Sequence, residues 1–282
     1  MTKNSADTGK SILITGCSSG IGYDAARTLS DRGWRVFATC RKQADCDRLR
    51  EDGLESFTLD HADQASMEAA LAEVLDRTGG TLDALFNNGA FAIPGAVEDL
   101  PTDALRKIFE TNLFGYHHLT RLVIPVMRAQ GHGRIINNSS VLGMAALPWR
   151  GAYVATKFAL EGLTDTLRLE MRATPIKIIT IQPGPITSRI RQNSIPHFER
   201  WIDRENSARA GLYRKLQGRL YDDSGTPDRF ELPPSAVTKR LIHALESPNP
   251  KPRYYITTAT RIAGIARRLL STRMSDRLTP SG

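Results

Sequence analysis

Short apolar segments alternate with helical segments along most of the chain, and this alternation limits the fold more than any other feature. Strand-like runs occupy residues 11–15, 34–40, 56–60, 82–87, 134–139 and 176–181. Helical spacing of apolar side chains occupies residues 23–32, 64–77, 102–130 and 152–173. Strands separated by helices of this length form a parallel sheet covered on both faces. We therefore expect an α/β fold, with a doubly wound parallel sheet in three layers.

A glycine-rich turn follows the first strand at the edge where such sheets bind ligands, outside the carboxyl ends of the strands. The turn reads Gly16-Cys17-Ser18-Ser19-Gly20-Ile21-Gly22 and leads directly into a helix. Glycines allow a tight turn, and the helix N-terminus offers free amide groups and partial positive charge. The turn suits a pyrophosphate, although glycines at this spacing are also compatible with a simple connection.

The end of the second strand indicates which dinucleotide would bind. Sites for NAD place Asp or Glu about 20 residues beyond the glycines, where the carboxylate binds the ribose hydroxyls. Arg41 and Lys42 occupy this place instead. A guanidinium and an ammonium suit a 2′-phosphate, which a carboxylate would repel. The sequence therefore predicts NADP rather than NAD, and the alternative is a solvated pair of cations on a loop.

Four polar residues further along the chain form a candidate catalytic group. Tyr153 and Lys157 are four residues apart, which places them on one face of a predicted helix. Ser140 follows the fifth strand, and Asn112 lies inside the long helix, where asparagine is uncommon. Each residue alone has an ordinary structural explanation. Their order along the chain favours catalysis.

The motifs together resemble the short-chain dehydrogenases/reductases of about 250 residues. The resemblance covers residues 11 to about 190 and rests on Thr15-Gly-x-x-x-Gly20-x-Gly22, Asp60, Asn87-Asn88-Gly89, Asn112, Ser140, Tyr153-x-x-x-Lys157 and Pro183-Gly184-Pro185-Ile186-Thr187. Residues 37–42 and the basic C-terminal extension are most similar to NADP-dependent reductases of aldehydes, retinal and 17β-hydroxysteroids. The family usually has Asn-Ala-Gly where this chain has Asn88-Gly89-Ala90. We expect a local backbone change there, with cofactor binding retained.

The resemblance implies a Rossmann fold and an oxidoreductase that moves a hydride between NADP(H) and a carbonyl or alcohol. An unperturbed tyrosine has a pKa near 10, and a nearby ammonium together with the nicotinamide cation would favour its ionised form. Tyr153 would then exchange the proton, Lys157 would also hold the nicotinamide ribose, and Ser140 would bind the carbonyl oxygen. Asn112 would position a water that links Lys157 to solvent. The cofactor contacts carried over are Gly16, Ser18, Ser19, Gly20, Ile21, Gly22, Arg41, Lys42, Asp60, Asn88, Gly89, Tyr153, Lys157, Pro183, Gly184, Ile186 and Thr187.

The segment after Thr187 predicts the class of substrate. We expect residues 188–232 to form a mobile lid over an apolar cleft, because aromatic and aliphatic side chains are scattered among its charges. Those side chains are Ile190, Ile195, Phe198, Trp201, Leu212 and Tyr213, and residues 91–93 and 141–147 would add apolar walls. A hydrophobic aldehyde or ketone and its alcohol fit such a cleft. The alternative is that these side chains pack only against the domain.

Charge is concentrated near the C-terminus. The net charge is +8, yet residues 1–188 carry 20 basic and 21 acidic side chains, whereas residues 189–282 carry 18 basic and 9 acidic ones. A neutral body argues against nucleic-acid binding. We expect one catalytic domain over residues 1–257 and a basic amphipathic extension over residues 258–282. The extension would contact an anionic membrane surface, or pack on the body or on a second subunit in a homo-oligomer.

The cysteines and the first segment of the chain bear on where the protein is located. Three cysteines without a C-x-x-C motif and a first segment without an apolar core predict a cytoplasmic protein, with peripheral membrane contact as an alternative. No spacing of Cys and His suggests a metal site.

A redox sensor that binds NADP without turnover is the main competing function, but such a sensor has no chemical need for Ser140, Tyr153 and Lys157 together.

Overall fold

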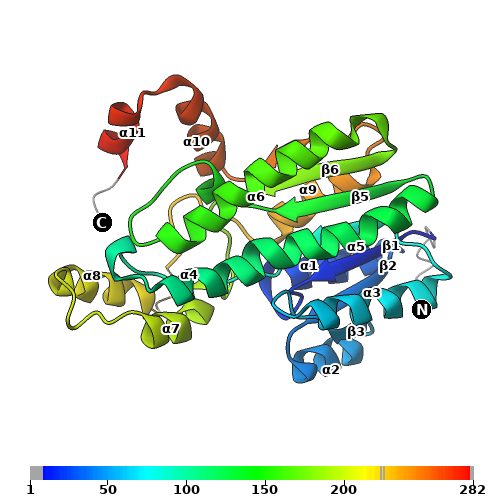
Figure 1. Cartoon of the computed structure of the whole chain (residues 1–282), viewed down its shortest axis with the longest axis horizontal. Helices are drawn as coiled ribbons and strands as arrows, with labels where there is room; N and C mark the ends of the chain where they lie inside the picture. Colours follow the sequence, from blue (N-terminus) through cyan, green and yellow to red (C-terminus); the bar gives the residue numbers. More distant parts are fainter. Residues whose placement is uncertain (1–8, 223, 225, 280–282) are drawn as a thin grey trace.

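The predicted parallel sheet is present in the computed structural model, which describes residues 9–222, 224 and 226–279. Within these residues, seven strands pair in parallel in the order β3-β2-β1-β4-β5-β6-β7 (Figure 1). The strands are β1 (Ser11–Thr15), β2 (Arg35–Cys40), β3 (Glu55–Thr58), β4 (Ala84–Asn87), β5 (Gly133–Asn138), β6 (Ile176–Gln182) and β7 (Arg253–Tyr255). The chain reverses direction across the sheet after β3, so the carboxyl ends of β1 and β4 are neighbours and define the place for a ligand.

Helices cover both faces of this sheet and produce three layers. They are α1 (Gly20–Asp31), α2 (Gln43–Glu51), α3 (Gln64–Thr78), α4 (Thr102–Phe109), α5 (Gly115–Ala129), α6 (Gly151–Glu170) and α9 (Ser235–Glu246). Successive side chains of a strand point to opposite faces. Accordingly, Ile12 and Ile14 of β1 pack in the core layer with α1 and α9, whereas Leu13 packs in the layer with α3 and α5.

The long helix expected over residues 102–130 is interrupted. A π-helical segment, Glu110–Phe114, separates α4 from α5, and α5 continues past Pro125 to Ala129. Asn112 lies in this segment and is fully buried. Its amide brackets the backbone of Phe91, accepting from the Phe91 N–H at 3.1 Å and donating to the Phe91 carbonyl at 2.9 Å. The wider π turn directs the Asn112 side chain into the layer beneath the site.

Two helical pairs extend from the carboxyl edge of the sheet. One pair is α7 (Ile190–Trp201) and α8 (Ala210–Leu220), and the other is α10 (Thr258–Leu269) and α11 (Thr272–Leu278). Figure 1 shows α7 and α8 beside α4, and α10 and α11 projecting at the end of α6. Among the described helices, none has the length and apolar character needed to cross a membrane.

Candidate functional site

The glycine turn after β1 has no room for side chains. Gly16 and Gly20 have φ values of 72° and 58°, in the left-handed region that favours glycine. A Cβ on Gly16 would lie 2.5 Å from the Cα of Gly89, and one on Gly22 would lie 2.3 Å from the Gly16 carbonyl oxygen. The turn after β1 and the turn after β4 are therefore packed backbone against backbone, and the amides at the start of α1 face the edge of the sheet.

Asn88 holds these two turns together. Its side chain donates to the carbonyl oxygens of Thr15 and Gly16 at 3.0 and 3.2 Å. The Thr15 hydroxyl accepts from the backbone N–H groups of Asn88 and Gly89 at 2.9 and 3.1 Å. Asn138 at the end of β5 donates to the Asn88 side-chain oxygen at 2.8 Å. Asn88, which was expected to contact the cofactor, thus links the carboxyl ends of β1, β4 and β5 through its hydrogen bonds.

The end of β2 lies beside the glycine turn. The Cys17 N–H donates to the Thr39 carbonyl at 2.9 Å, which brings the exposed Arg41 and Lys42 next to the turn. Arg48 on α2 also reaches back and donates to the Ser18 carbonyl at 2.6 Å, while pairing with Asp45 at 3.3 Å. Sequence reasoning missed Arg48, because its approach depends on how α2 packs. Three cations therefore lie on the segments next to the glycine turn.

Ser140, Tyr153 and Lys157 come together at the carboxyl end of β5, as their order along the chain predicted. The Ser140 side chain lies close enough to Tyr153 to lower the pKa of its phenol, and the Ser140 hydroxyl accepts from the Leu142 N–H at 3.1 Å. The Lys157 ammonium lies 5.5 Å from the centre of the Tyr153 ring and donates to the Asn138 carbonyl at 2.7 Å. Lys157 is only 1 % exposed, so its charge is largely removed from water.

Burial shifts the pKa values of this cluster away from the tyrosinate and the charged ammonium that the sequence predicted. Burial raises the pKa of Tyr153 to about 12, and the nearby Ser140 side chain opposes the rise. Burial lowers the pKa of Lys157 to about 7, and the carboxylate of Glu161 opposes the fall. The expected ionisation of Tyr153 depended on a nicotinamide cation, so in the protein alone the phenol is a firmly held proton donor.

A polar residue that the sequence reasoning missed lies one helical turn beyond Lys157. Glu161 is buried on the same face of α6, where it accepts from Gln182 of β6 at 2.8 Å and from Arg253 of β7 at 2.9 Å. Arg253 also pairs with Asp165, one further turn along, at 2.8 Å. The i, i+4 spacing of Lys157, Glu161 and Asp165 was a visible signal for this row of charges.

Asn112 is near the cluster but contacts other groups. Besides bracketing Phe91, it donates to the Thr156 hydroxyl at 3.3 Å, and among the described residues it has no hydrogen bond to Lys157. The Lys157 ammonium instead lies 5.4 Å from the centre of the Tyr116 ring. The structure therefore gives Asn112 a supporting role for the segment after β4, and the water-positioning role stays a prediction.

A buried histidine also supports the site. His61, directly after Asp60, packs against Tyr116 with ring centres 4.9 Å apart. Its Nδ1 lies 3.1 Å from the Gly89 carbonyl, and burial lowers its pKa to about 4. His61 is therefore neutral near pH 7. Asp60 itself accepts from the Ala62 N–H at 2.9 Å and shapes the turn after β3.

The segment after β6 packs against the glycine turn that follows β1. The Pro183 carbonyl accepts from the Val141 N–H at 2.7 Å, and a Cβ on Gly184 would lie 2.1 Å from the Thr257 hydroxyl oxygen. A Cβ on Gly20 would lie 3.2 Å from the Cβ of Ser188, so this segment also packs on the glycine turn. The Thr187 hydroxyl, expected to meet the nicotinamide, donates to Glu231 at 2.7 Å.

The apolar side chains expected to line a cleft divide into two groups. Phe198 and Tyr213 are 0 % and 1 % exposed and belong to a core cluster with Phe91 and Ile93. The Tyr213 hydroxyl donates to Asp99 at 2.7 Å and accepts from the Ala96 N–H at 3.0 Å. These two side chains therefore pack against the domain, because α7 and α8 fold onto α4. By contrast, Ile190 is exposed.

Comparisons with known proteins agree with this geometry. Residues 10–198 match the family model of the short chain dehydrogenases. The uncharacterized oxidoreductase YbbO of Escherichia coli (strain K12) is 36 % identical over 269 residues, which cover 95 % of this chain and 93 % of YbbO.

Two solved structures share the fold at 22 % identity. The closed form of serine dehydrogenase complexed with NADP+ has a TM-score of 0.74 and covers 89 % of this chain and 95 % of its own. A short chain dehydrogenase/reductase from Burkholderia phymatum in complex with NAD has a TM-score of 0.75 and covers 98 % of each chain. The family match and the similarity to YbbO extend over the glycine turn and the Ser140, Tyr153 and Lys157 cluster. The chain therefore belongs to the short-chain dehydrogenase family of oxidoreductases.

Proposed function

We propose that the protein interconverts a hydrophobic aldehyde or ketone and its alcohol, with NADP(H) as the redox partner. The observation that carries this proposal is the cluster of the half-buried Ser140 and Tyr153 with the buried Lys157, beside a glycine turn that excludes side chains. A hydroxyl donor, a protonated phenol and an ammonium around one point are what the oxygen of a carbonyl needs as it gains negative charge.

The residues at the carboxyl edge fit a nicotinamide dinucleotide. Side chains at Gly16 and Gly22 would collide with the backbone of Gly89 and of Gly16, so this tight turn requires glycine. The first turn of α1 adds its partial positive charge, which suits a pyrophosphate. Arg41, Lys42 and Arg48 favour a phosphate on the adenosine ribose, hence NADP. One structural neighbour holds NADP+ and another holds NAD, which supports the cofactor class. When bound, NADP(H) supplies or accepts the hydride.

Side chains of the protein, rather than the cofactor, transfer the proton of the reaction. In the direction of reduction, Tyr153 gives its phenolic proton to the oxygen of the former carbonyl, and Ser140 donates a hydrogen bond to the same oxygen. The Lys157 ammonium, held by the Asn138 carbonyl, stabilises the phenolate that remains. In the direction of oxidation the phenolate takes the alcohol proton. Burial makes each of these interactions stronger than it would be in water.

The surroundings support an apolar substrate. Val141 and Leu142 directly follow Ser140, and Phe91 and Ile93 belong to the apolar cluster against which Tyr153 packs, so few polar groups would satisfy a charged substrate. We infer that residues 188–232, which include α7 and α8, form the lid of the catalytic domain over residues 1–257.

The proposal is tested by following NADPH and NADH oxidation with aliphatic aldehydes, retinal and ketosteroids, and with a 2-oxo acid and an aldose as polar controls. We expect turnover of the apolar carbonyls with NADPH. Turnover confined to the polar controls, or to NADH, would contradict the proposal. Tight NADPH binding with no turnover of any carbonyl would favour the redox sensor instead.

A further inference from the structure

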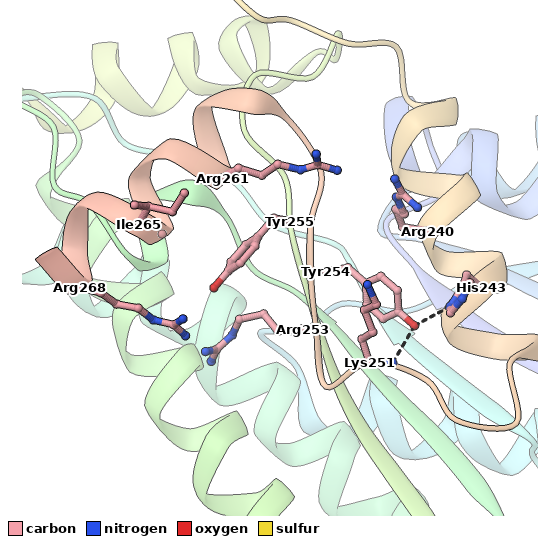
Figure 2. Close-up of a pocket in the computed structure, with 10 residues that line it drawn as sticks. Arg240, His243, Lys251, Arg253, Tyr254, Tyr255, Arg261, Ile265 and Arg268 are labelled. Carbon is pink, nitrogen blue, oxygen red and sulfur yellow. Dashed lines mark hydrogen bonds between the residues drawn. The ribbon is translucent and has the colours of Figure 1, made fainter.

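A cavity of about 410 Å³ lies at the β7 edge of the sheet, between α9, β7 and α10. Figure 2 shows Arg261 extending from α10 toward Arg240 of α9, with Lys251 between the helices. Arg253, Arg268 and the Tyr255 hydroxyl line its other end. Among the described residues that line the cavity there is no Asp or Glu.

The positive charges of this cavity are poorly neutralised by the protein. Arg253 pairs with Glu161 and Asp165, but its Nε is a buried donor without a hydrogen-bond partner among the described residues. Arg240, Arg261 and Arg268 have no ion pair or hydrogen bond with any described side chain. Guanidinium groups that converge without a carboxylate repel one another unless an anion lies between them, and their planar fork suits phosphate oxygens.

An apolar surface adjoins the cavity. Ile262, Ile265 and Leu269 of α10 and Met274 and Leu278 of α11 are each at least 50 % exposed. Ile265 both lines the cavity and belongs to this surface. The first three are spaced three and four residues apart, so they share one face of α10, and the two helices carry five arginines and a single acid, Asp276. Apolar side chains beside arginines are typical of helices that lie in a membrane interface.

We propose that α10 and α11 dock on an anionic membrane surface, with the phosphate of a lipid headgroup in the cavity between α9, β7 and α10. The exposed apolar face explains why the phosphate belongs to a lipid rather than to a free anion or a nucleic acid, neither of which would bury it. A second copy of the chain fits less well, because a two-fold contact would bring the basic cavity against itself.

Docking there would take place next to the catalytic cluster. Arg267 of α10 donates to the Gly143 carbonyl at 3.3 Å and lies 5.0 Å from the centre of the Phe158 ring. Gly143 ends the short helical turn that begins directly after Ser140. The docked face would therefore lie beside the segment that follows Ser140, which, on the proposed function, brings the catalytic cluster close to the membrane where apolar aldehydes and ketones concentrate.

Sedimentation of the full-length protein with vesicles tests the proposal. Vesicles of phosphatidylcholine are compared with vesicles of phosphatidylcholine mixed with phosphatidylglycerol. We expect binding to the mixed vesicles only, and a loss of about fivefold in affinity for each cation removed by Arg261→Gln, Arg268→Gln or Arg240→Gln. Arg240 lies on α9 and not on the apolar face of α10, so a loss of vesicle binding in Arg240→Gln would show that the cavity takes part in binding. Leu269→Asn should weaken binding without changing charge.

Arg128→Gln and Arg172→Gln are the matched controls, since both arginines are exposed and neither lines the cavity nor belongs to α10 or α11. They remove the same charge and should leave vesicle binding unchanged. Equal losses in the controls, or no binding of the wild-type protein to mixed vesicles, would overturn the proposal.

Titration with glycerophosphate and inorganic phosphate completes the test: binding of either with no vesicle binding would assign the cavity to a soluble anion. If the wild-type protein is a dimer that does not bind vesicles, and Leu269→Asn dissociates this dimer, the apolar face of α10 and α11 is a contact with a second copy of the chain.

Discussion

Arg253 on β7 donates a hydrogen bond of 2.9 Å to the carboxylate of Glu161, which lies one helical turn beyond Lys157 on α6. Gln182 fixes the other oxygen of the same carboxylate at 2.8 Å. Glu161 is therefore held from two strands while its charge raises the pKa of Lys157 against the larger effect of burial. We regard Glu161 as a positioning residue that keeps the ammonium charged near neutral pH.

Replacing Glu161 should change the pH dependence of the reaction. Glu161→Gln removes a charge that raises the pKa of Lys157, so the ammonium should lose its proton at a lower pH. The alkaline limb of kcat for NADPH-dependent reduction should therefore move to lower pH, as measured by initial rates across buffers. Asp165→Asn is the control, because Asp165 also pairs with Arg253 but is two helical turns from Lys157. An equal shift in both variants would contradict this role.

Removing the phenolic hydroxyl should abolish turnover. Tyr153→Phe retains the ring that packs in the apolar cluster but removes the proton donor. A loss of about 10²–10⁴-fold in kcat is expected for a general acid. NADPH binding, followed by the fluorescence of the reduced nicotinamide, should persist. Substantial turnover by a clean preparation of the variant would refute the proton-transfer role.

The cations after β2 should control the choice of cofactor. Arg41→Ala removes a charge-assisted hydrogen bond to a 2′-phosphate, for which a loss of roughly 1.5–3 kcal/mol is typical. The KM for NADPH should rise by about one to two orders of magnitude, while the KM for NADH changes little. Arg172→Ala, at the opposite edge of the domain, should leave both values unchanged. A parallel rise for NADPH and NADH would exclude phosphate recognition.

The burial of Lys157 should be visible in stability. Its pKa is lowered from 10.5 to about 7 in the folded protein, so between these pH values the unfolded chain binds more protons than the folded one. The free energy of unfolding of the cofactor-free protein should rise with pH across this window, by at most about 1.4 kcal/mol per pH unit from this group. Urea titrations should show that Lys157→Met removes this rise. An unchanged slope in Lys157→Met would show that the side chain is not desolvated.

Two helical glycines should respond oppositely to alanine. A Cβ on Gly115 would lie 2.3 Å from the His61 carbonyl oxygen, so Gly115→Ala should destabilise the fold by about 1–3 kcal/mol. Gly162 on α6 has no atom within 4 Å of such a Cβ, and Gly162→Ala should stabilise by about 0.5–1 kcal/mol. Thermal unfolding of both variants measures the difference. Equal effects would mean that the close approach of α5 to the β3–α3 turn does not constrain Gly115.

Sequence patterns predicted the features that depend on local order along the chain. The parallel sheet followed from the alternation of strands and helices, and Ser140, Tyr153 and Lys157 followed from their places at strand ends and on one helical face. Arg48 and Glu231 could not be identified in this way, because their contacts arise when separate elements pack, whereas the i, i+4 spacing from Lys157 was a signal for Glu161 that was missed. The π turn at Asn112 was hidden for a related reason, since one extra residue in a turn leaves the apolar spacing almost unchanged.

Asn88 and Asn138 fix the geometry of the site before a dinucleotide binds. A continuous series of hydrogen bonds runs from the glycine turn through Asn88 to Asn138, and the Asn138 backbone then receives the Lys157 ammonium. The phosphate end and the proton-transfer end of the site are thereby joined by one rigid polar frame. The span between them is set during folding, so the conformational entropy of ordering the site is lost before a dinucleotide arrives and does not weaken its affinity.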